Sequence, residues 1–303
     1  LLPTLTAMGI TLAAGLLMMV LFRVKGADNI SQREGMAIVT LGWTAVGFFG
    51  ALPFYLGGEI PQFVDAFFES VSGFTTTGSS ILTHIEGMSD GLLLWRSFIQ
   101  WLGGMGIIVL SLAILPFLGV GGMQLYKAEV PSPVPDKLKP RIRETAMILW
   151  KVYALISLAE VIFLMFGGMS LFDALCHTFT TMPTGGFSTK NASIAGFESP
   201  YIHYVIITFM YLAGINFALH FRAVTGHLDY FKDHEWRFFT GLLLLATLAL
   251  LVLNLSGGTY PFTPGGGIHA AGTFTPSEGI AWGYISAGMF AQEVVTPFTV
   301  GHV

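Results

Sequence analysis

The chain has little charge and almost no cysteine. Of its 303 residues only 11% are charged while 53% are hydrophobic, and the mean hydropathy is +0.69. Soluble domains carry about 25% charged residues, so this composition excludes an ordinary soluble fold. The single cysteine, Cys176, excludes an intrachain disulfide and a cysteine-based metal cluster. The net charge of −4 gives no reason to expect nucleic acid as a partner.

Common catalytic motifs are also missing. The sequence contains neither the His-Glu-x-x-His zinc motif nor the Gly-x-x-x-x-Gly-Lys phosphate loop. We also expect no Gly-x-Ser-x-Gly nucleophile elbow. The chain is therefore predicted not to be an enzyme and to need no cofactor.

What the sequence does contain is a series of long apolar runs. A helix needs about 20 residues to cross a bilayer. Six runs reach that length, at residues 3–22, 35–57, 91–118, 145–168, 201–221 and 237–256. We therefore expect an all-α integral membrane protein. The first run is not a convincing signal peptide, because no basic segment and no initiating Met precede it, and we expect residues upstream of Leu1.

Basic residues gather in alternate connections between these runs. Eleven of the 14 Lys and Arg residues follow the first, third or fifth run: Arg23, Lys25, Arg33, Lys127, Lys137, Lys139, Arg141, Arg143, Arg222, Lys232 and Arg237. The positive-inside rule places these connections in the cytoplasm. The segments 58–90, 169–200 and 257–280 contain one basic residue, Lys190, and are expected to face outside.

The outward-facing segments contain a repeat. "DAFFESVSGFTTTGSS" from Asp65 and "DALCHTFTTMPTGGFS" from Asp173 align without a gap, and a third match, "FAQEVVTPFTVGHV", ends the chain. The unit is a span, a stretch of about ten residues, a Thr-x-Gly loop and a second span, recurring about every 110 residues. Ten residues are too few to cross a bilayer and fit a re-entrant half-helix.

These loops have the composition of an ion filter. Non-helical backbone at membrane depth occurs where it is buried in protein or lines a watery cavity. Glycine lets successive carbonyls point at one axis, and stacked carbonyls can replace the hydration shell of a monovalent cation. The candidate filter residues are Thr76, Thr77, Gly78, Ser79, Thr184, Gly185, Gly186, Phe187, Thr299, Val300 and Gly301. The direct ion ligands among them are Thr76, Thr77, Thr184, Gly185, Thr299 and Val300. The alternative is that Thr and Gly only form a turn at a helix end, and the recurrence argues against it.

Several longer motifs resemble the Trk/Ktr family of potassium-uptake membrane subunits, most closely the TrkH and TrkG type. They are "REGMAIV" (33–39), "DAFFESVSGFTTTG" (65–78), "WRSFIQWLGGMGIIVL" (95–110), "GGMQLYKAEVP" (121–131), "KLKPRIRETA" (137–146), "TGGFSTKNASI" (184–194) and "GINFALHF" (214–221). The resemblance implies helix, half-helix and helix units around a pseudo-fourfold pore axis, and potassium uptake across the bacterial inner membrane. It also implies a homodimer that docks a cytoplasmic TrkA-type nucleotide-binding subunit.

On this resemblance the chain divides into five parts. Residues 1–23 are an accessory N-terminal helix, 33–119 the first pore repeat, 120–140 a cytoplasmic loop, 141–225 the second repeat and 235–303 an incomplete third repeat. A truncated chain is expected, because the family has four repeats. Proton coupling stays open, as do three alternatives: a sodium-linked Ktr-type protein, a weakly selective cation channel, and a non-conducting truncated protein.

Some polar residues in the apolar runs have two interpretations. Glu160 is either functional, as an intramembrane carboxylate, or has a pairing or snorkelling role. Asn216 and His220 are expected to make packing hydrogen bonds between helices. Trp95 and Arg96 are interpreted as an interfacial anchor.

Other residues are assigned to the ends and approaches of the half-helices. Asp65 and Asp173 are expected to cap them and, together with Glu69, to enrich cations at the outer mouth by their negative charge. Gly103, Gly104 and Gly106 permit close helix approach.

Overall fold

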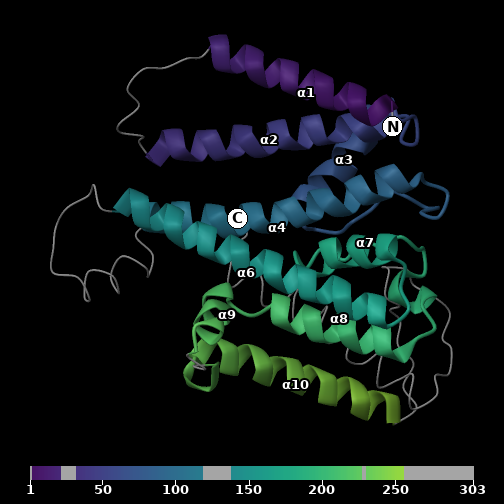
Figure 1. Ribbon diagram of the computed structural model, residues 1–303, viewed down its shortest axis with the longest axis vertical. Coiled ribbons are helices and arrows are strands. Elements are labelled where there is room, and N and C mark those ends of the chain that lie inside the picture. Colours follow the sequence, from purple (N-terminus) through teal and green to yellow (C-terminus); the bar gives the residue numbers. More distant parts are fainter. Residues whose placement is uncertain (1, 22–31, 119–137, 227–229, 256–303) are drawn as a thin grey trace.

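The computed structural model describes residues 2–21, 32–118, 138–226 and 230–255, and these residues form helices joined by turns and loops, with no strand among them. Long helices lie roughly side by side, and two short ones, α3 and α7, lie against the central ones (Figure 1). In chain order the helices are α1 (Leu2–Leu21), α2 (Gln32–Leu56), α3 (Phe63–Phe74), α4 (Asp90–Leu118), α6 (Leu138–Phe166), α7 (Leu171–Thr181), α8 (Pro200–Ala213), α9 (Phe217–Val224) and α10 (His234–Leu255), with 3₁₀ turns η2 (Ser193–Gly196) and η3 (Tyr230–Lys232).

Two of the three expected half-helices lie in the described part of the chain. The helix α3 has 12 residues and α7 has 11. Each is packed between longer helices: α3 contacts α2 and α4, and α7 contacts α6, α8 and α4. The helix α4 therefore touches both half-helices and lies between the two units.

Three described helices are long and apolar enough to cross a membrane, at Thr4–Leu21, Glu34–Leu56 and Ala146–Phe166. They match three of the six expected spans. The expected runs 91–118 and 237–256 correspond to α4 and α10.

The expected run over 201–221 forms two helices rather than one, and together they are long and apolar enough to cross a membrane. The helices α8 and α9 meet at an angle of 100° across a short break. Gly214 ends α8 where the ring of Phe239 lies against it, leaving no room for a side chain. Asn216 then caps α9 by accepting the Ala218 N–H at 3.0 Å. A local polar cap thus overrides the apolar periodicity of the run.

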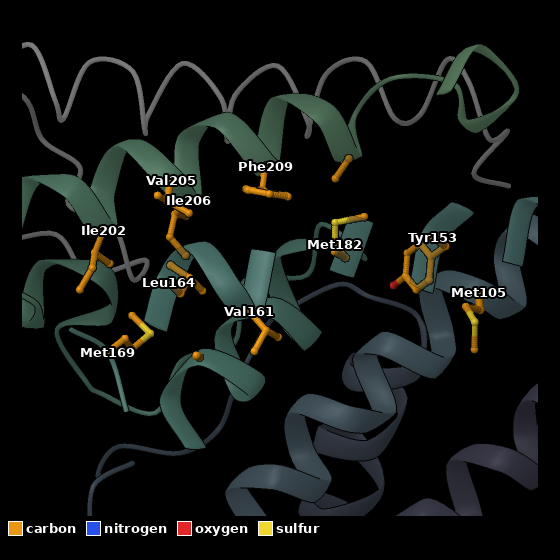
Figure 2. Packing of buried hydrophobic residues seen from close by; sticks show 12 residues of the cluster. Met105, Tyr153, Val161, Leu164, Met169, Met182, Ile202, Val205, Ile206 and Phe209 are labelled. Carbon is orange, nitrogen blue, oxygen red and sulfur yellow. The ribbon is translucent and has the colours of Figure 1, made fainter. Parts of the chain in front are cut away.

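Each unit has its own apolar core. In the first, Phe54, Ala66, Phe74 and Ile99 bring α2, α3 and α4 together. In the second, the core joins α6, α7 and α8, and Figure 2 shows Ile202, Ile206 and Phe209 of α8 beside Leu164 of α6.

The caps of the two half-helices differ. Ser170 caps α7: its hydroxyl accepts the Asp173 N–H at 3.0 Å and donates to the Asp173 carboxylate at 2.7 Å. Asp173 thus takes part in a cap, as expected. In α3 the cap residue is Gln62, which makes no side-chain capping bond. The capping role predicted for Asp65 is therefore wrong: Asp65 occupies the same first-turn position as Asp173, but Gln62 forms no side-chain capping bond in which it could take part.

Candidate functional site

The two Thr-x-Gly loops begin where α3 and α7 end, and they have the same backbone shape. Thr76 and Gly78 have φ angles of 57° and 75°, and Thr184 and Gly186 have φ angles of 64° and 76°. Each pair lies 108 positions from the other, which is the offset of the sequence repeat. Left-handed backbone is rare for a β-branched residue. Strain of this kind persists where the surrounding structure imposes it, commonly at functional sites.

The same three backbone hydrogen bonds close each loop onto its half-helix. They run from Thr76 to Gly73 (3.0 Å), Thr77 to Ser72 (3.0 Å) and Gly78 to Ser72 (3.5 Å), and from Thr184 to Thr181 (2.9 Å), Gly185 to Thr180 (3.0 Å) and Gly186 to Thr180 (3.1 Å). The N–H and C=O of a trans peptide point in opposite directions, so the carbonyls at 75–77 and 183–185 point away from the helix ends. Within the described ranges none of these carbonyl oxygens accepts a hydrogen bond.

The two loops also touch. A Cβ atom added at Gly78 would collide with the carbonyl oxygen of Gly185. Gly78 therefore serves two purposes, since it adopts a left-handed conformation and lets a carbonyl of the second loop approach. An unbonded carbonyl oxygen of the second loop therefore lies against the backbone of the first, and backbone carbonyls are the ligands that ion filters offer to a cation.

Three other candidate filter residues make local hydrogen bonds or are buried in the protein. The Thr77 hydroxyl lies 2.8 Å from that of Thr75, which also donates to the Val71 carbonyl. The Ser79 carbonyl accepts a hydrogen bond from the Ser72 hydroxyl. The Phe187 side chain is buried. The third predicted loop, Thr299, Val300 and Gly301, lies outside the described residues.

The expected close approach at the α4 glycines is present. Gly103 lies against the carbonyl of Phe74, and Gly104 lies against Pro183, with 2.6 Å between an added Cβ and the proline Cβ. The base of each loop therefore rests on α4. Gly106 is less crowded, with Trp43 at 3.7 Å.

The sequence-based interpretation of Arg96 as an interfacial anchor is wrong. Its side chain is 2% exposed, and its Nε donates to Glu69 Oε1 at 2.6 Å. The neighbouring Trp95, predicted to share that role, donates its indole N–H to the Gly50 carbonyl at 3.1 Å and thereby joins α4 to α2. The prediction that Glu69 adds charge at an outer mouth is wrong too, because Glu69 is fully buried and neutralised by Arg96.

Gln100 is a site residue that sequence reasoning missed. It lies one turn after Arg96 on α4, fully buried between the loops, and its Oε1 accepts the Phe187 N–H at 3.3 Å. Its Nε2 has no hydrogen-bond partner among the described residues. The available signal was the spacing of Arg96, Gln100, Gly103 and Gly104, which places polar and small residues on one face of an apolar helix.

Of the remaining polar candidates, His220 and Asn216 have hydrogen-bond partners and Glu160 does not, within the described residues. His220 hydrogen-bonds with the Tyr230 hydroxyl and the Leu212 carbonyl, at 2.9 and 2.8 Å, and Asn216 donates to Glu235 at 3.3 Å. Both thus have the expected packing roles. Glu160 is fully buried, and in the part of the chain that is described its carboxylate has neither an ion-pair nor a hydrogen-bond partner.

The Gly-x-Ser-x-Gly motif does occur once in the sequence. Residues 87–91 read Gly-Met-Ser-Asp-Gly, so the expectation of no such spacing was wrong. A nucleophile elbow requires a strand-to-helix turn, whereas Ser89 follows a loop and its N–H donates to Glu59 at 3.0 Å. No group of His, Cys, Asp or Glu suited to a metal ion occurs among the described residues.

Long apolar helices, with short helices and glycine-containing loops packed between them, define a class: all-helical membrane proteins. A family model, TrkH, described as "Cation transport protein", matches residues 6–259. The chain therefore belongs to the TrkH family of cation transport proteins.

Individual relatives agree with this assignment. The Trk system potassium uptake protein TrkH of Escherichia coli K12 is 47% identical over 240 residues, which cover 76% of this chain and 50% of that protein. TrkG of the same strain is 36% identical over 234 residues, covering 76% of this chain and 47% of its own. The crystal structure of the potassium transporter TrkH from Vibrio parahaemolyticus aligns with a TM-score of 0.79 at 34% identity, over 95% of this chain and 56% of that one. The chain thus spans about half the length of these relatives.

Proposed function

We propose that this chain forms part of a potassium-uptake pathway, with the loops at 76–79 and 184–187 as two quarters of its filter. The observation that carries the proposal is the shared left-handed backbone at Thr76, Gly78, Thr184 and Gly186. This backbone turns unbonded carbonyls of both loops away from the helix ends, and carbonyls of touching loops can replace water around a monovalent cation. The sequence 299–301 would contribute a third loop.

The orientation of the half-helices also favours a positively charged ion. The carbonyl ends of α3 and α7 face their loops, and the C-terminal end of a helix carries partial negative charge. Such an end stabilises a cation and repels an anion. Transport rather than catalysis is therefore the proposed activity.

The proposed setting follows the charge pattern and the family. The chain would lie in the bacterial inner membrane with its filter loops outside, because the basic connections belong in the cytoplasm. Names of relatives support potassium as the transported ion. A homodimer with a TrkA-type nucleotide-binding subunit on the basic loop 120–140 is part of the proposal, and so is the division into repeats at 33–119, 141–225 and 235–303.

Rubidium uptake by cells that lack their own potassium-uptake systems tests this function. The complete product of the gene should restore uptake and prefer rubidium to sodium. Equal uptake of both ions would instead indicate a weakly selective channel, and uptake that requires external sodium a Ktr-type mechanism. No uptake by the complete product would refute the proposal, while uptake by it and not by residues 1–303 alone would show that these residues do not suffice.

A further inference from the structure

We propose that Arg96 and Gln100 of α4 are positioning residues that hold the two candidate filter loops at a fixed separation, and that they help to set the preference between potassium and sodium. This inference rests on the proposed function. It assigns a selectivity role to two side chains that lie beside the filter rather than in it.

Arg96 joins the two repeats directly. On one side its Nε donates to Glu69 of α3 at 2.6 Å. On the other side its Nη1 donates to the carbonyl of Ser188 at 3.2 Å, and its guanidinium lies 3.5 Å from the centre of the Phe187 ring. Phe187 is the last residue of the second loop and Ser188 follows it, so one planar cation binds both repeats.

The first repeat holds its end of this link with further bonds. The Glu69 carboxylate accepts the Ser80 hydroxyl at 2.9 Å and the Ile81 N–H at 3.1 Å. Ser80 and Ile81 follow directly after the first loop. The buried ion pair therefore connects the segments that leave both loops, and neither charge is left without compensation.

A buried ion pair is an expensive way to gain stability, since desolvation can exceed the attraction between the charges. Ionisable residues within membrane helices are correspondingly rare and commonly functional. Glu69 has no carboxylate counterpart in the second repeat: the aligned residue, 108 positions later, is His177, whose Nε2 lies 3.5 Å from the Thr189 hydroxyl. Arg96 thus links two unlike repeats, and repetition alone does not explain it.

Gln100 makes a second connection one helical turn further along α4. Its Oε1 accepts the Phe187 N–H, while its Nε2, buried and without a partner among the described residues, lies against Gly185. A Cβ atom at Gly185 would collide with this amide. An unpaired buried donor costs stability, and here it is kept beside the contact between the two loops.

Selectivity depends on where carbonyl oxygens lie, whether through the size of the cavity or through the number and field of the oxygens around the ion. Both views make the separation of neighbouring loops a determinant. A link that fixes this separation from outside the ion path changes ion preference without contacting an ion.

Arg96→Lys is the most discriminating variant. Lysine keeps the charge beside Glu69 but cannot form the planar fork and stack that also reach Ser188 and Phe187. In the complete gene product we expect normal abundance in the membrane and a fall of about tenfold in the ratio of rubidium to sodium uptake, the scale of one lost hydrogen bond to a charged group. Gln100→Leu should act in the same direction.

The matched control is Glu198→Gln, a charge-removing change at an exposed residue after the second loop; it should leave both the ratio and the abundance unchanged. Hydrogen exchange over residues 184–189 gives a readout that does not need transport, and it should accelerate in Arg96→Lys and Gln100→Leu but not in the control. Unaltered exchange and an unaltered uptake ratio in both α4 variants would overturn the inference. If the unsubstituted protein took up no rubidium, the proposed function would fail, while accelerated exchange would still establish the link between the loops.

Discussion

Gly78 and Gly58 differ in the reason why each position needs glycine. Both have positive φ, 75° and 77°, so a side chain strains the backbone at either position. Only Gly78 also meets the other loop, since an added Cβ would collide with the Gly185 carbonyl, whereas nothing lies within 4 Å of one at Gly58. The contact with the second loop, added to the dihedral angle, therefore distinguishes Gly78 from Gly58.

Gly78→Ser should therefore relax the preference for rubidium over sodium, while Gly58→Ser should cost about 1–2 kcal/mol of stability through backbone strain alone and keep that preference. Competition between the two ions in the uptake assay measures the first effect, and thermal unfolding of purified protein measures the second. An unchanged ion preference in Gly78→Ser would count against a filter at this loop.

The helix α4 acts as a wall shared by both units. It contacts α3, α7 and α6. Gly103 receives the backbone of the first loop's base and Gly104 that of the second, and Arg96 and Gln100 lie on the same face. An element of this kind cannot be moved without moving both loops.

Gly103→Ala should destabilise the protein by about 1–3 kcal/mol, the usual cost of overpacking a tight contact, because the added methyl group meets the Phe74 backbone. Gly106→Ala is the matched control on the same helix. Its methyl group would have ordinary contact with Trp43, and alanine favours helix, so its stability should be equal or slightly higher. Chemical denaturation in detergent compares the two, and equal losses would show that the approach at Gly103 is not tight.

At the scale of the whole molecule, the two units are also joined between the segments that follow their loops. The Glu86 carboxylate accepts the Asn191 N–H at 2.7 Å, and the Asn191 side chain accepts the Ile85 N–H at 2.9 Å. The bond from Asn191 lowers the pKa of Glu86 below its ordinary value of 4.5. This exposed link lies between loop segments and is separate from the buried link made by Arg96.

A lowered pKa in the folded state means that the link stabilises the protein above the ordinary pKa of the carboxyl group and loses that contribution as pH falls through the folded-state pKa. Acidification below pH 4.5 should therefore weaken the contact, and Glu86→Gln should remove this part of the pH dependence. The effect should be small because the group is exposed. Unfolding temperatures of both proteins across an acidic pH series measure it, and parallel curves would exclude the contribution.

Much of the candidate site could be read from the sequence because it repeats. The ungapped match between 65–80 and 173–188 placed both half-helices and both loops, since periodic sequence demands similar local structure. The roles of Trp95, Arg96 and Glu69 could not be read in this way. Each depends on a partner distant in the chain: Glu69 and Ser188 are separated by 119 positions, and Arg96 joins them.

The sequence by itself determined the all-helical membrane class, the repeat, and the position of the loops, because hydropathy and glycine placement act locally and leave marks in the order of residues. Tertiary structure decided the 100° bend after Gly214, the burial of Arg96 against Glu69, and the contact of Gly78 with Gly185. These features depend on which surfaces meet. The burial of a charge or the approach of two backbones is a property of the packed pair and not of either segment.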